Sequence, residues 1–148
     1  MTPARPCVMG IGNAFRGDDA VGLVVAQRVR ALLPGAEVLE LSGEPAELLE
    51  ALGTRTERVV LVDAVTSGAS PGTVHRLDAS EAALGVDAAT STHGLGLAET
   101  IELGRALGLL PARLLVYGIE AESFELGMPL SPAVARAADA LVRELGTL

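Results

Sequence analysis

The sequence predicts a three-layer α/β domain with a mostly parallel sheet, and three observations support this. Short apolar runs typical of buried strands alternate along the chain with segments in which apolar residues recur every three or four positions. The run at 58–63 is continuously apolar, as in a central strand covered on both faces. No repeat, linker or low-complexity tract divides the chain, so residues 1–148 are expected to form a single domain.

Apolar spacing and local start and stop signals predict the individual elements. Pro34-Gly35 ends the first helix, and Ser131 as N-cap with Pro132 at the first helical position starts the last one. The turn at Pro71-Gly72 brings the next strand close enough to the preceding one to pair with it antiparallel. Residues 79–91 are expected to be loop with a helical turn. The predicted strands are 8–11, 37–41, 58–63, 73–77 and 114–118, and the predicted helices are 21–33, 46–52, 95–108 and 133–145.

Composition excludes several functional classes. The balance of 11 basic and 19 acidic residues gives a net charge of −8, which argues against nucleic acid and anionic membrane surfaces as partners. Cys7 is the single cysteine, so neither a disulfide framework nor a cysteine zinc site is expected. No segment approaches the ~18 continuous apolar residues of a membrane span, and the N-terminal apolar run is too short for a signal peptide. We therefore expect a soluble, cytoplasmic protein.

The most informative segment is the glycine-rich turn at 10–22, between the first strand and the first helix. Such a turn often cradles phosphate on its bare backbone N–H groups. Here it carries Asp18 and Asp19, whose charge repels phosphate and suits a cation. An aspartate just before a helix is a good N-cap, and we assign this role to Asp18. Because one residue holds the cap, Asp19 is left to point elsewhere.

Two further residues complete a candidate site beyond the carboxyl ends of the strands, where ligands bind in such sheets. Asp63 ends a run that should be buried, where aspartate is a poor strand residue, although it would also suit a cap of the following turn. His93 lies in a loop of small residues before a helix; His75, on a predicted edge strand, is interpreted as a surface residue. Asp19, Asp63 and His93 would form a three-ligand set suited to nickel or zinc.

Four motif segments follow one another along the chain: Gly10-Ile-Gly-Asn13 with Gly17-Asp-Asp-Ala-Val-Gly22, Leu61-Val-Asp-Ala64 with Pro71-Gly72, Thr92-His-Gly94, and Gly118-Ile-Glu120 with Leu130-Ser-Pro-Ala-Val134. The ordered set covers essentially the whole chain, with 44 residues from Asp19 to Asp63 and 30 from Asp63 to His93. Together these segments resemble the hydrogenase maturation endopeptidases, the family that trims the large subunits of nickel–iron hydrogenases. Ala20 is a departure, since glycine is common there in the family.

The resemblance implies a three-layer α/β/α domain with a twisted five-stranded sheet, and an endopeptidase of aspartic or metal-dependent type. The family's metal-contacting residues fall on Asp19, Asp63 and His93, which we take as both catalytic and metal-contacting. It further implies that the free enzyme has no permanent metal. The nickel is carried by the partner, a nickel–iron hydrogenase large-subunit precursor, whose C-terminal extension is cleaved after nickel insertion. Asp19 and Asp63 both remain candidates for the general base, and we expect a monomer.

Three alternatives are open at this point. A nucleotide-binding α/β module would need a third glycine at position 15, where the chain has Phe15. A non-catalytic chaperone that senses nickel-loaded protein would not need all three candidate ligands, which are intact here. A conventional zinc peptidase is disfavoured because the sequence has no His-Glu-x-x-His helix.

Overall fold

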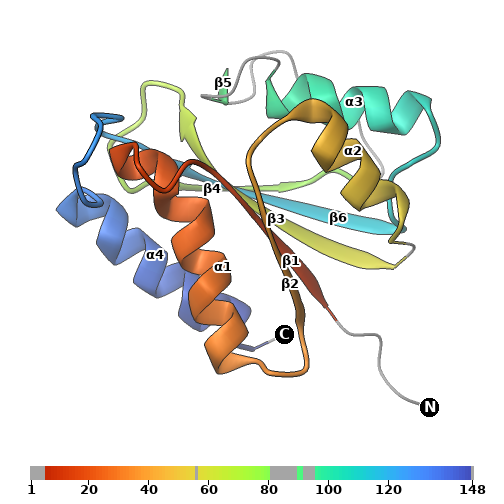
Figure 1. The fold of residues 1–148 in the computed structure, drawn as a ribbon, viewed down its shortest axis with the longest axis horizontal. Helices are drawn as coiled ribbons and strands as arrows, with labels where there is room; N and C mark the ends of the chain where they lie inside the picture. Colours follow the sequence, from red (N-terminus) through yellow and green to blue (C-terminus); the bar gives the residue numbers. More distant parts are fainter. Residues whose placement is uncertain (1–5, 56, 81–89, 92–95, 148) are drawn as a thin grey trace.

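Strands and helices alternate along the chain as the apolar spacing predicts (Figure 1). The computed structural model describes residues 6–55, 57–80, 90–91 and 96–147. The strands are β1 (Cys7–Ile11), β2 (Glu37–Leu41), β3 (Arg58–Thr66), β4 (Val74–Asp78), β5 (Thr90–Ser91) and β6 (Arg113–Glu120). The helices are the 3₁₀ turn η1 (Gly17–Ala20), α1 (Val21–Leu32), α2 (Pro45–Gly53), α3 (Leu97–Ala106) and α4 (Pro132–Leu145).

The sheet has the strand order β2-β1-β3-β6-β4. Strands β2, β1, β3 and β6 run parallel to one another, whereas β4 pairs antiparallel with β6 at one edge. The two-residue β5 lies off this path and pairs antiparallel with the end of β3. The predicted α/β fold with a five-stranded, mostly parallel sheet is confirmed.

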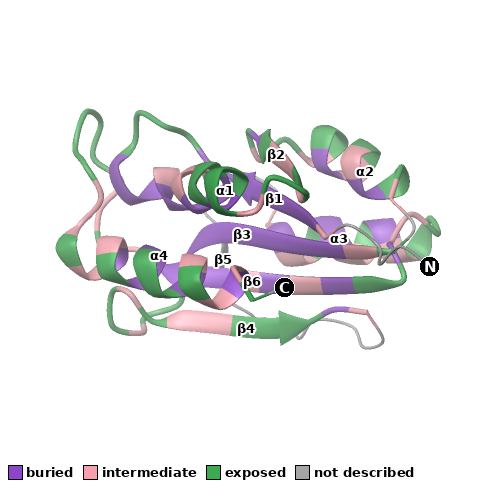
Figure 2. Cartoon of the chain, turned by 90° about the horizontal axis from the view of Figure 1, so that it is seen from below, coloured by how far each residue is buried: buried purple, intermediate pink, exposed green. Residues whose placement is uncertain are grey.

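Helices cover both faces of the sheet and enclose two apolar cores. Helices α1 and α4 lie together on one face, and α2 and α3 lie together on the other (Figure 1). Side chains of β1 and β3 alternate between the cores: Val8, Val60 and Val62 face α1 and α4, while Met9 and Leu61 lie in the opposite core. The central strand β3 is buried almost throughout, and the edge strand β4 is exposed along much of its length (Figure 2). Among the described helices, none has the length and apolar character needed to cross a membrane.

The prediction that strand 73–77 pairs with strand 58–63 is wrong: β4 pairs with β6 instead. Proximity in sequence favoured a hairpin, but both sides of β3 are occupied by parallel neighbours, β1 and β6. The chain after β3 therefore passes the end of β6, where Gly72 N–H donates to Glu120 O and Glu120 N–H donates to Thr73 O, both at 2.8 Å. This crossing places β4 on the outer side of β6.

Several element boundaries also differ from the prediction, and β6 continues two residues beyond its predicted end, to Glu120. β3 continues to Thr66, three residues beyond Asp63, because Ala64 and Val65 still pair with β6. The helix predicted at 95–108 is α3, Leu97–Ala106. Within the predicted loop at 79–91, Thr90–Ser91 form β5, and residues 81–89 lie outside the described part of the chain.

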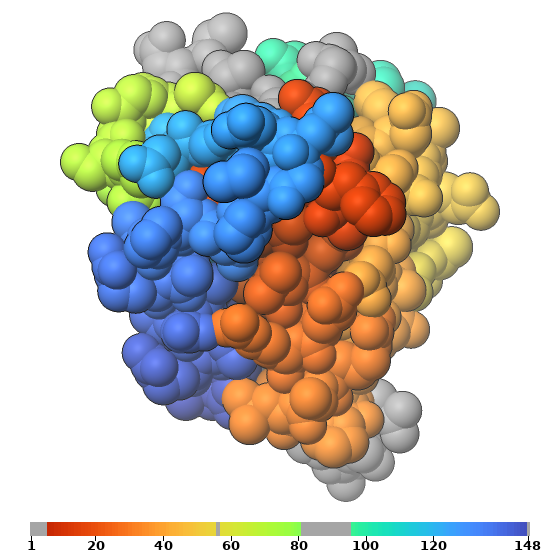
Figure 3. All heavy atoms as spheres, turned by 60° about the vertical axis from the view of Figure 1, so that its left-hand side comes forward, coloured from red at the N-terminus to blue at the C-terminus, as the bar shows by residue number. Residues whose placement is uncertain are grey.

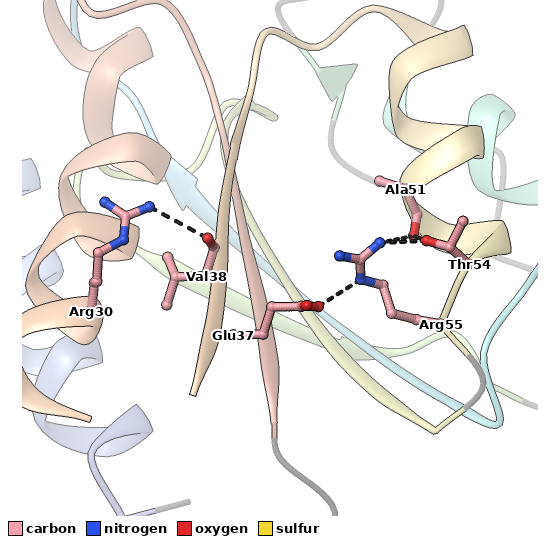
Figure 4. A network of polar contacts seen from close by, with 6 residues as sticks. All are labelled: Arg30, Glu37, Val38, Ala51, Thr54 and Arg55. Carbon is pink, nitrogen blue, oxygen red and sulfur yellow. Dashed lines mark hydrogen bonds and ion pairs between the residues drawn. The ribbon is translucent and has the colours of Figure 1, made fainter. Parts of the chain in front are cut away.

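Arginines from both helical layers hold the edge strand β2 (Figure 4). Arg30 of α1 donates to the carbonyl of Val38 at 3.4 Å. Arg55, which follows α2, forms an ion pair with Glu37 at 2.7 Å and donates to the carbonyl of Ala51 at 3.1 Å.

Cys7 is the Cα partner of Glu37 at the amino end of β1, the end opposite to the candidate site. Burial, aided by the neighbouring Glu37 carboxylate, raises the pKa of the Cys7 thiol to about 11.

Candidate active site

Glycines in the turn after β1 allow η1 and α1 to rest directly on strand backbone. A Cβ atom at Gly22 would collide with the carbonyl oxygens of Ile11 and Val62, one on β1 and one on β3. A Cβ atom at Gly10 would collide with the carbonyl of Gly22, and one at Gly12 with the carbonyl of Asp19. The glycines of this motif therefore serve close packing of helix on sheet. They fix the backbone of the turn that carries Asp19.

Asp19 and Asp63 lie at the same edge of the sheet. Asp19 is in η1, which packs against β3. Only 1% of its surface is exposed. Asp63 is in β3, also 1% exposed, and directly follows Val62, whose Cα partner on β1 is Gly10. One Asp63 carboxylate oxygen accepts the N–H of Ala64 at 2.8 Å. Two carboxylates are thus buried on contacting elements where β1 ends.

The prediction that Asp18 caps its own helix is wrong. The N-cap residues are Arg16 for η1 and Ala20 for α1, and neither makes a side-chain capping hydrogen bond. The buried carboxylate of Asp18 instead accepts hydrogen bonds from a distant loop: from the N–H groups of Glu122 (2.8 Å), Ser123 (3.0 Å) and Ser131 (2.7 Å), and from the Ser131 hydroxyl (2.8 Å). Asp18 is therefore structural, as expected, but it orders the loop before α4.

Ser131 is the N-cap residue of α4 and Pro132 occupies the first turn, as predicted. The Ser131 side chain makes no capping hydrogen bond to its own helix, and its hydroxyl donates to Asp18.

The third predicted ligand, His93, lies outside the described residues. The nearest described residues are Ser91, whose Cα partner is Val65 on β3, and Gly96, the N-cap of α3. Within the described ranges, no group of three or more His, Cys, Asp or Glu side chains is placed to hold a metal ion. The structure thus brings Asp19 and Asp63 to one edge, and the place of His93 stays a prediction.

A second buried carboxylate group, not anticipated from the sequence, lies at the carboxyl end of β6. Glu120 is 2% exposed and accepts the Ser67 hydroxyl at 2.5 Å and the Ser67 N–H at 2.8 Å. Nε2 of His75 lies 3.1 Å from the same carboxylate. His75 is accordingly half-buried and paired with Glu120, contrary to its interpretation as a surface residue. The sequence could have indicated Glu120, because it is an acidic residue at the end of an apolar strand, as Asp63 is.

The surroundings of Glu120 favour its ionised form. Burial alone would raise the pKa of this carboxyl, but hydrogen bonds from Ser67 and the neighbouring His75 together lower it below its ordinary value. The charged carboxylate therefore ties the segment after β3 and the edge strand β4 to the end of β6. These contacts hold the carboxyl end of the sheet together, where Asp63 also lies.

Comparison with known proteins identifies the family. A family model described as hydrogenase maturation protease matches residues 25–147. The chain belongs to the hydrogenase maturation protease family. It is 33% identical over 134 residues to the hydrogenase 2 maturation protease of Escherichia coli, covering 88% of this chain and 81% of that protein. It is 30% identical over 148 residues to the hydrogenase expression/formation protein HupD of Rhodobacter capsulatus, covering 96% of this chain and 70% of that protein.

Solved structures of the same family share this fold. The hydrogenase maturating endopeptidase HybD of E. coli superposes with a TM-score of 0.73 at 27% identity, covering 96% of this chain and 90% of that one. The [NiFe] hydrogenase maturation protease HycI of Thermococcus kodakarensis gives a TM-score of 0.72 at 27% identity, covering 97% and 90%. The resemblance drawn from the sequence motifs is confirmed, and this chain is a hydrogenase maturation protease by sequence and by fold.

Proposed function

We propose that this maturation protease is a cytoplasmic endopeptidase that removes the C-terminal extension of a nickel–iron hydrogenase large-subunit precursor after nickel insertion. The observation that carries the proposal is the placement of two buried carboxylates, Asp19 and Asp63, on contacting elements at the carboxyl edge of the sheet. The name of the T. kodakarensis relative, a [NiFe] hydrogenase maturation protease, supports the substrate class.

In this proposal the nickel ion belongs to the substrate. Asp19, Asp63 and His93 would add oxygen and nitrogen ligands to an ion already held by thiolates of the precursor, a combination that suits nickel. His93 follows Ser91 by two residues, a chain length of at most about 7 Å, and Ser91 pairs with β3 two residues beyond Asp63. This proximity along the chain supports including His93 in the set.

The proposed reaction is hydrolysis of one peptide bond. The ion positions the scissile peptide and polarises its carbonyl, and water adds to the carbonyl carbon. One of the two aspartates accepts a proton from that water, and the departing amine takes up a proton as the C–N bond breaks. The products are a new C-terminal carboxylate on the large subunit and a released peptide. Asp19 and Asp63 are both assigned as candidates for the base.

The proposal is tested with purified precursor in its nickel-loaded form, with the mass of the intact large subunit as readout. We expect the wild-type protein to shorten the precursor at one position, and Asp19→Asn, Asp63→Asn and His93→Ala to slow cleavage at least about a hundredfold. Asp139→Asn is the matched control, because Asp139 of α4 forms an exposed ion pair with Arg28 of α1. Tight binding of the precursor by the wild type without any change of mass would favour the chaperone alternative.

A further inference from the structure

Large apolar side chains are exposed on two loops beside the candidate active site. Among the large apolar residues of the described chain, Phe15 (76%) and Leu126 (72%) are the most exposed, and Met128 is 51% exposed. We call these three residues the apolar platform. Exposed apolar groups that gather in one place mark surfaces that another molecule covers. The platform is therefore a candidate interaction surface.

The two loops that carry the platform are joined to each other. Gly127 N–H donates to the carbonyl of Phe15 at 2.9 Å, and Asp18 N–H donates to the carbonyl of Ser123 at 2.9 Å. Gly17 has a φ of +54°, and a Cβ atom there would lie 2.7 Å from the Ser123 carbonyl oxygen. Figure 3 shows the light-blue loop before α4 lying against the red segment that precedes α1. The platform is thus held in shape before any partner arrives, which lowers the entropic cost of binding.

The platform is continuous with the candidate catalytic edge. The Asp19 N–H donates to the carbonyl of Arg16 at 3.0 Å, and the Asn13 N–H donates to the carbonyl of Asp19 at 3.2 Å. Hydrogen bonds to the backbone of Asp19 therefore connect both sides of the loop that carries Phe15. A molecule that covers Phe15 must lie next to the residue that the proposed function places at the scissile bond.

The charge around the platform favours a basic partner. Glu122 and Glu125 are exposed on the loop that carries Leu126, and Arg16 is the neighbouring exposed cation. The whole chain has a net charge of −8. Complementary charge speeds encounter and selects partners of opposite sign.

We propose that the apolar platform docks an apolar segment of the precursor polypeptide that is flanked by basic residues, and so presents the scissile bond to the edge that contains Asp19. This inference rests on the proposed function. A precursor is favoured over a second copy of this chain, because a second copy seated there would cover the approach to Asp19 and would bring another net charge of −8. A few apolar anchors at the centre of an interface usually contribute most of the binding energy.

The docking surface is tested by binding rather than by cleavage. Nickel-loaded precursor is titrated against Asp63→Asn protein, which is expected to cleave at least about a hundredfold more slowly than the wild type, with and without the further changes Phe15→Ser and Leu126→Ser. We expect the double platform variant to bind at least about tenfold more weakly. Leu107→Ser is the matched control, because Leu107 is 59% exposed at the end of α3 in the other helical layer. In the otherwise wild-type protein, the platform variant should raise KM by a similar factor and change kcat less than twofold.

The contribution of the acidic residues beside the platform is measured separately. Glu122→Gln with Glu125→Gln should weaken binding at low salt and reduce the dependence of the dissociation constant on ionic strength. An unchanged dissociation constant in the platform variant, or an equal loss in Leu107→Ser, would overturn the proposal. So would a dimer of the free protein that the platform variant abolishes, since the occupant would then be a second copy. Platform-dependent binding without any cleavage by the wild type would overturn the proposed function and leave the docking surface intact.

Discussion

Asp18 and Ser131 are hydrogen-bonded twice, although 113 residues separate them in the chain. The Ser131 N–H donates to Oδ1 of Asp18 at 2.7 Å and the Ser131 hydroxyl donates to Oδ2 at 2.8 Å. Asp18 thereby fixes the start of α4 against the turn that holds Asp19. Neighbouring aspartates in one motif thus have separate roles: one orders the loops, and the other belongs to the candidate active site.

The first prediction separates these two roles by stability. Asparagine offers one acceptor oxygen where Asp18 uses both, so Asp18→Asn leaves at least one buried N–H without an acceptor. We expect the free energy of unfolding to fall by about 2 kcal/mol, measured by urea denaturation. This is more than a cap replacement would cost, because asparagine is itself a good N-cap. A loss below about 0.5 kcal/mol would show that the four hydrogen bonds do not hold the loop.

Asp19→Asn is expected to behave in the opposite way. It should abolish processing of the nickel-loaded precursor and change the melting temperature little, because the proposed role of Asp19 is toward the substrate. The two variants are compared by melting temperature and by intact mass of the precursor after incubation. Equal losses of stability in both variants would contradict the division of roles.

The second prediction concerns the contact of α1 with the sheet. A methyl group at Gly22 collides with the backbone carbonyls of Ile11 and Val62, neither of which can move without disturbing a strand. We expect Gly22→Ala to lower the free energy of unfolding by about 3 kcal/mol. The matched control is Gly35→Ala, where a Cβ atom meets nothing within 4 Å and φ is not positive. Equal stability of the two variants would refute the close packing.

The third prediction is a dependence of stability on acid. Although burial opposes it, the hydrogen bonds from Ser67 and His75 lower the pKa of Glu120 below its ordinary value. A lowered pKa contributes stability at pH values above the unfolded pKa of about 4.3, and this is lost as the pH falls through the folded pKa. Glu120→Gln should therefore lose less stability than the wild type on acidification below about pH 4.3, measured by denaturant unfolding. Glu125→Gln, at an exposed position, serves as control and should retain the wild-type pH dependence.

The fourth prediction concerns the thiol of Cys7. Its pKa is raised to about 11 in the folded protein, against about 8.5 in an unfolded chain. The resulting stability is complete below about pH 8.5 and is lost as the pH rises toward 11. Native protein at pH 8 should react with a thiol reagent only as fast as it unfolds, and Cys7→Ala should flatten the loss of stability between pH 8.5 and 11. Rapid reaction of the native thiol would contradict its burial.

Much of the fold could be predicted from local pattern, because the strands and helices follow apolar spacing within single segments. The last helix illustrates this: its buried residues recur at helical spacing, and Ser131-Pro132 marks its start. Asp63 could be chosen because aspartate is costly where an apolar run is buried. Asp19 could be chosen because it lies in the glycine-rich turn and only one of the two adjacent aspartates was expected to cap the helix.

Features that depend on distant partners could not be predicted in the same way. Three such features connect segments that lie far apart in the chain. They are the pairing of β4 with β6, the hydrogen bonds that Asp18 accepts from the loop before α4, and the pairing of His75 with Glu120. Local rules instead favoured a hairpin, a helix cap and a surface histidine. The glycine motif was noticed for its chemistry, whereas the structural use of Gly22 depends on the position of β3, which lies 40 residues later.

The central claim is that the ion required for cleavage belongs to the precursor. The most direct test compares two reactions by intact mass: chelator-treated, desalted protease with nickel-loaded precursor, and nickel- or zinc-supplemented protease with nickel-free precursor. We predict that only the first reaction removes the C-terminal extension. Cleavage of nickel-free precursor by the zinc-supplemented protease would contradict the claim and assign the ion to the protease.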